Sequence, residues 1–120
     1  MNKYEALCNF YSGFGIPAYE ENSVPEKAKM PYITYEAITS GFDSQNVALS
    51  FQIFFKSESL MKIDTLTDKL SDALRGHVKL KCDEGYIILY RGEPFAQNVS
   101  TGDKATKCKY VNILADYITL

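Results

Sequence analysis

The clearest hydrophobic pattern of this 120-residue chain is an uncharged stretch from Val47 to Phe55. Because successive side chains of a β-strand point to opposite faces, Leu49, Phe51 and Ile53 lie together on one face, which must be buried. The opposite face is also nearly free of charge and carries Phe54. We therefore expect this second face to be covered as well, by another element of the chain or by a neighbouring copy.

Two segments have apolar side chains at the three- to four-residue spacing of a helix. Residues 3–12 predict a short helix that ends at Gly13. Residues 57–74 predict a long amphipathic helix, which Ser57 or Ser59 can cap at its start and Arg75-Gly76 can close. We expect the long helix to cover one face of a sheet, with the short helix on the same side.

Short runs of β-branched and aromatic residues predict the other strands of this sheet. The turn-rich hexapeptide 41–46 joins one such run to the uncharged strand, so the two are expected to form a hairpin at the centre of the sheet. Pro17 places its own strand at a sheet edge, because proline donates no ladder hydrogen bond. These further strands are expected at 14–19, 31–39, 77–82, 85–91 and 107–120.

Two polar segments lack such patterns and are expected to be loops. One is 20–29, and the other, 92–103, contains Pro94 and Gly102 and is expected to be a mobile connection. No internal repeat or interdomain linker divides the chain. The sequence therefore predicts one domain, residues 1–120, of the α+β class: a mostly antiparallel sheet with one long amphipathic helix and a short N-terminal helix packed on it.

Composition excludes several classes of partner. Hydrophobic residues make up 46% and charged residues 23%, which is typical of a globular domain that folds without a metal or a disulfide. The formal net charge of −2 gives no electrostatic reason to expect binding to nucleic acid or to an anionic membrane. No apolar run approaches the roughly 18 residues needed to cross a bilayer.

Residues with catalytic or ligand-binding chemistry are few. The three cysteines are scattered and form neither a closed disulfide set nor a CxxC pair, and no glycine-rich phosphate-binding motif is present. His77 is the single histidine, so any histidine-dependent enzyme would have to use this ring, for example with Asp83 or Glu84. We expect His77 to be structural, and no catalytic residue, cofactor site or metal site is expected.

The order of elements resembles the small tail-completion or tail-terminator proteins of long-tailed bacteriophages and of prophages in Gram-positive hosts. The resemblance spans nearly the whole chain. Its pieces are Gly-Ile-Pro-Ala-Tyr at 15–19, Met-Pro-Tyr-Ile-Thr-Tyr-Glu at 30–36, and Gln-Ile-Phe-Phe-Lys at 52–56 followed by a helix.

This resemblance implies an α/β sandwich that assembles as a ring, commonly a hexamer, at the head-proximal end of the tail tube. The ring would end tube polymerisation and help join tail to head, first in the host cytoplasm and then in the virion. The implied partners are other copies, the tail-tube protein and the head–tail connector, and the family has no catalytic residues. The alternatives are another neck protein, such as a stopper or adaptor, or a small hydrolase that depends on His77.

Polar loops on a small rigid sheet commonly carry function, so loops 41–46 and 92–105 are candidate contacts with a neighbour, the tube or the connector. Phe54 is added because it lies on the second face of the uncharged strand. The candidate interface residues are Phe42, Asp43, Gln45, Asn46, Phe54, Gln97, Asn98, Asp103 and Lys104.

Overall fold

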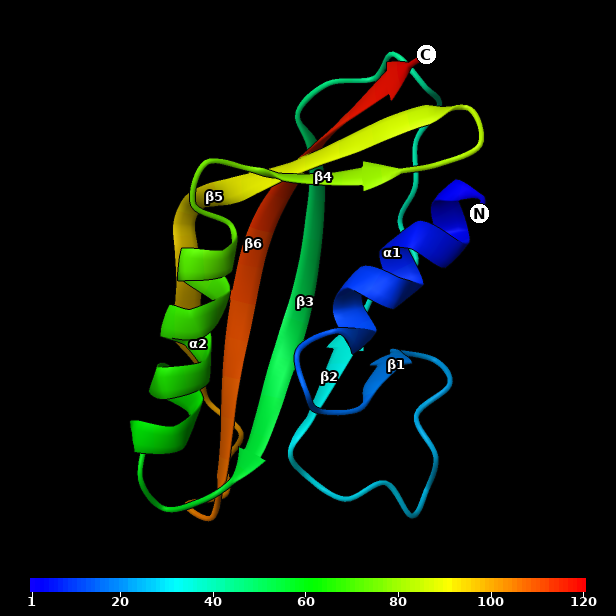
Figure 1. Cartoon of the computed structure of the whole chain (residues 1–120). Helices are drawn as coiled ribbons and strands as arrows, with labels where there is room; N and C mark the ends of the chain where they lie inside the picture. The colour runs from blue at the N-terminus through cyan, green and yellow to red at the C-terminus, as the bar shows by residue number, and fades with distance from the viewer.

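The computed structural model describes all 120 residues and contains six strands and two helices (Figure 1). Strands account for 42% of the chain and helices for 19%. In chain order the elements are α1 (Lys3–Ser12), β1 (Ala18–Glu20), β2 (Tyr32–Tyr35), β3 (Val47–Lys56), α2 (Met61–Ala73), β4 (Val78–Lys81), β5 (Gly85–Val99) and β6 (Thr106–Thr119).

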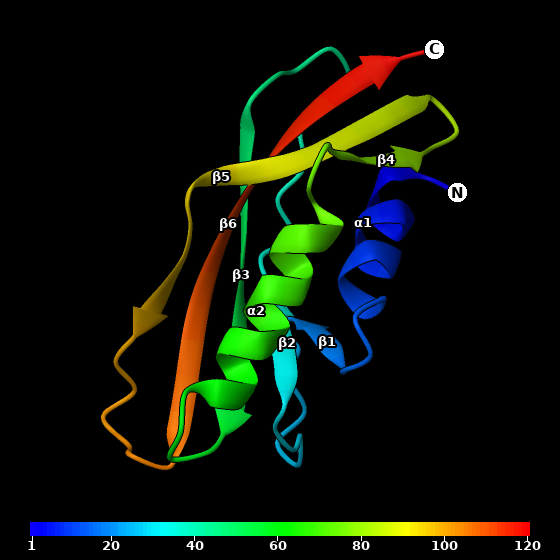
Figure 2. The same cartoon turned by 60° about the vertical axis from the view of Figure 1, so that its left-hand side comes forward.

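All six strands belong to one sheet with the order β1-β2-β3-β6-β5-β4. β1 and β2 run parallel, and every other neighbouring pair is antiparallel. The sheet curls into a half-barrel, and both helices lie against its inner side (Figures 1 and 2). We call this side the inner face and the opposite side the outer face.

The core lies between the inner face and the helices. Leu49, Phe51 and Ile53 of β3 are buried there, as the alternating pattern predicted. Helix α1 contributes Leu7 and Tyr11, and the stacking of its turns places both side chains on the sheet side. The same core cluster includes Ile63, Leu70 and Leu74 from the α2 region, and Val111, Ile113, Ala115 and Tyr117 from β6.

The prediction of an α+β fold with one long amphipathic helix is wrong. The structure is mostly sheet with two short helices, and α2 has 13 residues. The segment before Met61 does not join the helix, because the Ser57 N–H donates to the Ala105 carbonyl at 2.8 Å and continues the pairing of β3 with β6. The predicted serine cap is also not formed, because the N-cap residue is Leu60, whose side chain has no hydrogen-bonding group. The Ser59 hydroxyl accepts from the Met61 N–H at 3.1 Å in the turn that leads into α2.

The predicted hairpins form, but the centre of the sheet differs from the prediction. β2 pairs with β3, and β4 pairs with β5, both antiparallel. The central strands are β3 and β6, whereas β2 has four residues and lies next to the edge strand β1. β1 follows Pro17, so the predicted edge position of that segment is confirmed.

The predicted mobile connection at 92–103 is also wrong for most of its length. β5 continues to Val99, after an irregularity in its pairing with β6 between Arg91 and Ala96. The 14 residues of β6 provide a pairing partner along this whole stretch, which is a long-range contact that local composition does not reveal. Only residues 100–105 remain as a connecting turn.

Gly85 starts β5 where the backbone of β6 passes close by. A Cβ atom at this position would lie 1.9 Å from the Ile118 carbonyl oxygen. We expect Gly85→Ala to lower the free energy of unfolding by about 1–3 kcal/mol, because the paired strands must move apart. Urea denaturation measures this loss. Gly41→Ala is the control, because nothing lies within 4 Å of the added atom there; equal losses in the two variants would contradict the close approach.

Candidate interaction surface

The outer face of the sheet has no cover from this chain. Both helices belong to the core cluster on the inner face, so the outer side chains of the central strands β3 and β6 are left open, except Cys108, which is 4% exposed. Between Ala48 and Phe54 on β3 and between Cys108 and Ile118 on β6, these outward positions carry one charged residue, Asp116. Most are half-buried by their neighbours in the sheet: Ser50, Gln52, Phe54, Tyr110, Asn112, Leu114 and Asp116.

Aromatic and small polar groups make up much of this face. The rings of Tyr19, Tyr32 and Phe54 follow one another across β1, β2 and β3, with centroid distances of 5.9 and 5.4 Å. The Tyr110 hydroxyl donates to Ser50 Oγ at 2.8 Å. Aromatic residues with satisfied polar tips are enriched at protein interfaces, where charged residues are depleted. The composition of the outer face therefore matches a surface that another protein covers.

The one charge among these outward positions, Asp116, is held in a local network. Its carboxylate accepts from the Asn46 N–H at 2.8 Å and from the Tyr90 hydroxyl at 3.1 Å. Tyr90 also donates to the Asn46 side chain. Burial, followed by the hydrogen bond to Asp116, raises the pKa of Tyr90. The carboxylate is thus already solvated by protein donors, which reduces the cost of covering it.

Loop 41–46 is tied to the end of β6. The Asp43 N–H donates to the Tyr117 carbonyl at 2.7 Å, and the Asp43 carboxylate accepts from the Thr119 hydroxyl at 3.0 Å. Phe42 packs edge-on against Tyr117 at a centroid distance of 5.9 Å. Three of the four candidate interface residues in this loop, Phe42, Asp43 and Asn46, therefore have contacts within the chain, and Gln45 is exposed.

The other candidate residues lie at the opposite end of β3, roughly 33 Å away for a ten-residue strand. Gln97 is exposed and opposite Tyr110, while the Asn98 side chain accepts from Lys109 Nζ at 2.8 Å. Lys109 also pairs with Asp64 of α2 at 2.7 Å, which fastens the helix to β6. The candidates therefore form two separate groups, one at each end of the sheet.

Asp103 and Lys104 occupy the turn between β5 and β6. Hydrogen bonds from the Ala105 N–H and the Thr106 hydroxyl lower the pKa of Asp103, and both distances are 2.9 Å. This carboxylate therefore shapes the turn. Lys104 is exposed, and its carbonyl accepts from Lys107 Nζ at 2.9 Å.

The edge of the sheet beside this turn is open. β4 pairs only with residues 86–89 of β5, so the half of β5 that ends at Val99 has no strand on its other side (Figure 2). An unpaired edge can accept a strand from another chain. Pro94 and the irregularity before Ala96 interrupt this edge, which leaves a short uncharged segment, 95–99, as its accessible part.

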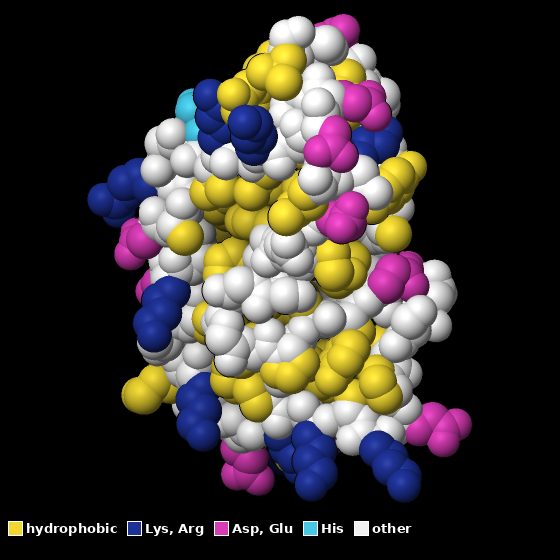
Figure 3. All heavy atoms as spheres, turned by 45° about the vertical axis from the view of Figure 1, so that its right-hand side comes forward, with side chains coloured by type: hydrophobic (Ala, Val, Ile, Leu, Met, Phe, Trp, Pro, Cys, Tyr) yellow, Lys and Arg dark blue, Asp and Glu magenta, His cyan; other side chains and the backbone are white.

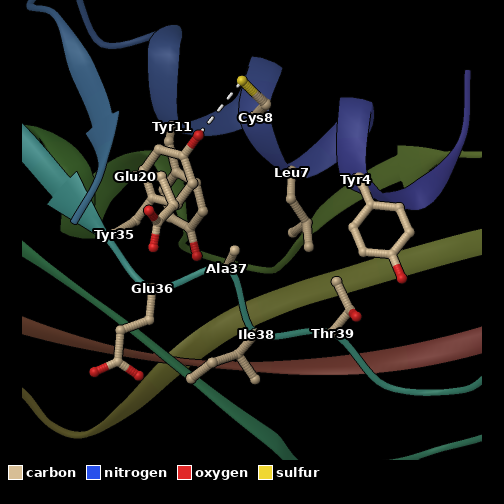
Figure 4. Close-up of a pocket in the computed structure, with 10 residues that line it drawn as sticks. All are labelled: Tyr4, Leu7, Cys8, Tyr11, Glu20, Tyr35, Glu36, Ala37, Ile38 and Thr39. Carbon is tan, nitrogen blue, oxygen red and sulfur yellow. Dashed lines mark hydrogen bonds between the residues drawn. The ribbon is translucent and has the colours of Figure 1, made fainter. Parts of the chain in front are cut away.

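A hollow of about 230 Å³ lies between α1 and the segment that follows β2 (Figure 4). Tyr11 and Tyr35 stack in it, with centroids 4.4 Å apart and planes at 16°. The Tyr35 hydroxyl donates to Cys8 Sγ at 3.5 Å. Burial, followed by this hydrogen bond, raises the pKa of Tyr35 to about 12. Figure 3 shows hydrophobic side chains over much of this side of the molecule, with acidic side chains along its right-hand border.

The sequence pattern did not predict this hollow. The sequence pattern identified Leu7, Tyr11 and Tyr35 as apolar positions of a helix and a strand. The hollow between them arises because α1 packs against β1 and β4 and leaves residues 37–39 uncovered. Glu20 and Glu36 lie at its rim. Neither carboxylate forms a salt bridge within the chain.

The pair that a His77-dependent hydrolase would need is not assembled. His77 is exposed before β4, where its ring meets Tyr90 at a centroid distance of 5.9 Å. Asp83 and Glu84 lie beyond the other end of β4, whose four extended residues alone span roughly 13 Å. The Asp83 carboxylate binds the N-terminal amine at 2.7 Å. No group of three His, Cys, Asp or Glu side chains is placed to hold a metal ion.

Comparisons with known proteins do not decide between a tail cap, another neck protein and a hydrolase. Neither α1 nor α2 has the length and apolar composition that a bilayer-spanning helix requires. No protein-family model matches the chain, and no curated protein matches it.

Proposed function

We propose that this chain is a structural protein of a long-tailed bacteriophage or prophage that assembles with its own copies into a ring and caps the tail tube. In this role it ends tube polymerisation and helps join the tail to the head. The proposal takes its biological setting from the resemblance described above, and its physical support from the surfaces of the sheet.

The observation that carries the proposal is the open outer face. A strand residue occupies about 3.3 Å along its strand and about 4.8 Å across the sheet, so the six strands present a face on the order of 800 Å². A stable interface typically takes about 800 Å² from each partner. The two central strands carry only two outward charges on this face, Lys56 and Asp116, each near one end of the sheet. A sheet face of this size and composition is better suited to another protein than to water.

A ring needs two different surfaces on each copy, because each contact repeats by rotation. The chain has different surfaces at its two sides. One side carries α1, the hollow and the edge strand β1, and the other carries α2 and the open half of β5 (Figure 1). These two sides are available for neighbours in a ring, which leaves the outer face for the tube or the connector.

The chemistry of the chain also favours association over catalysis. His77 and Asp83 lie at opposite ends of β4, and burial raises the pKa of the Cys82 and Cys108 thiols. Buried thiols with a raised pKa are poor nucleophiles. These placements give the hydrolase alternative no assembled set of groups.

The first experiment measures association directly. We expect size-exclusion chromatography with light scattering to give a multiple of the 13.6 kDa chain mass, either alone or after addition of a tail-tube protein. Negative-stain images should then show rings, free or at tube ends. A chain that stays monomeric and does not bind the tube would contradict the proposal.

The same experiment distinguishes a protein that caps the tail tube from a stopper or adaptor. A stopper would bind proteins on the portal side and leave tube ends uncapped. Tube length provides the readout, because a cap added during polymerisation shortens the tubes, whereas a stopper leaves their length distribution unchanged. His77→Gln is a useful companion variant, since a structural protein should assemble normally without this imidazole.

A further inference from the structure

The start of α2 presents an apolar projection at one side of the molecule. Met61 is 74% exposed and Leu60 is 40% exposed, and they are adjacent in the chain. A side chain as exposed as that of Met61 contributes little to the core. Figure 1 places this end of α2 at the lower left, toward the opposite lateral edge of the inner face from α1.

The hollow beside α1 provides a surface of matching chemistry. Its walls are mostly hydrophobic, and Leu7, Ala37 and Ile38 contribute to them (Figure 4). Tyr4, which is 57% exposed, borders the same space. A concave apolar site with a few polar groups is the usual form of a binding site.

Charges around the two features are complementary. Lys62 follows Met61, and Lys107 borders the same depression as Leu60. Neither lysine forms a salt bridge within the chain. The rim of the hollow carries Glu20 and Glu36, which are equally without a cationic partner. Glu58 also borders the depression beside Leu60, so two lysines and one carboxylate leave the surround of the projection net positive. This net charge and the acidic rim of the hollow favour one orientation of docking.

We propose that Leu60 and Met61 of one copy insert into the hollow beside α1 of the next copy. The projection and the hollow lie on different sides of the chain, so this contact is heterologous and repeats from copy to copy, closing into a ring when the rotation permits. The inference rests on the proposed ring assembly and identifies the contact that builds it.

Cys8 provides a direct test, because it lines the hollow and is the only exposed cysteine of the three. We expect Met61→Cys to form a disulfide with Cys8 of the neighbouring copy when a mild two-electron oxidant is added, because Cys8 lines the hollow that residue 61 would enter. Non-reducing electrophoresis should show a ladder of linked copies. The reaction is run on the chain alone and on the chain mixed with tail-tube protein.

Two controls make the result specific. Met61→Cys combined with Cys8→Ser leaves one accessible thiol on each chain and should give no linked copies. A disulfide-linked dimer in this variant would indicate contact between two projections and overturn the inference. Lys69→Cys places a thiol at another exposed position of α2 and should remain unlinked. Linking through Lys69→Cys as efficient as through Met61→Cys would indicate random collision and would also overturn it.

The outcomes distinguish this inference from the proposed function. If the wild-type chain forms rings or caps tubes but Met61→Cys gives no ladder, the insertion is wrong and the ring proposal stands on other contacts. If the wild-type chain neither self-associates nor binds tubes, both fail. Met61→Glu is a second test that needs no oxidant. We expect copies of this variant to associate at least tenfold more weakly, while the thermal midpoint of unfolding stays unchanged.

Discussion

Replacing Phe51 by alanine is expected to lower the free energy of unfolding by about 3–5 kcal/mol. Phe51 is 1% exposed on the inner face of β3, and its ring meets Tyr11 of α1 edge-on at 5.5 Å. Truncation removes this contact and leaves a cavity in the middle of the core. Because small domains are stable by only about 5–15 kcal/mol, a loss of this size is easily measured by urea denaturation.

Phe54→Ala is the matched control for this loss. Phe54 lies three residues away on the same strand, but on the outer face, where it is half-buried. We expect a loss of about 1 kcal/mol, since its ring stays partly in water and the truncation leaves no closed cavity. Similar losses for the two variants would contradict the assignment of inner and outer faces.

Replacing Leu114 by lysine is expected to weaken association at least tenfold, which corresponds to about 1.4 kcal/mol. Leu114 is half-buried near the middle of the outer face, on the central strand β6. A lysine there can extend into water in the free chain, so the thermal midpoint should change little. Once a partner covers the face, the ammonium group loses its water without gaining a carboxylate. Co-sedimentation of the variant with tail tubes measures this loss of binding.

Ala73→Lys is the control for the added charge. Ala73 is exposed at the end of α2, away from the outer face, so the same substitution should leave co-sedimentation unchanged. Retained binding of Leu114→Lys would show that the outer face is not the surface that meets the tube. The ring contact can still be tested separately, because Met61 and the hollow lie elsewhere on the chain.

Local patterns predicted much of the chain correctly. The alternation around Phe51 identified the buried face of β3, and the helical spacing before Gly13 identified α1. The turn residues before Gly85 identified the β4–β5 hairpin. These elements were predictable because side-chain periodicity and turn chemistry act over a few residues.

Other features depend on contacts between distant segments. The stretch around Pro94 reads as a loop in isolation, yet it lies in β5 because β6 extends beside it. The first residues of the expected long helix instead continue the β3–β6 pairing, as the bond from Ser57 to Ala105 shows. The hollow between α1 and residues 35–39 likewise comes from how a helix rests on the sheet, which no local pattern encodes.

Side-chain pattern alone indicates that one face of β3 is buried, that charge on the other is sparse, and that catalytic residues are few. The expectation that both helices lie on one side of the sheet is confirmed, whereas the central position of β6 and the open outer face became visible only in the folded chain. The physical reason is that burial of a face follows from side-chain pattern, whereas the choice of what covers it follows from chain connectivity and long-range packing. The same packing separates the projection at Met61 from the hollow beside α1 and gives each copy two different sides.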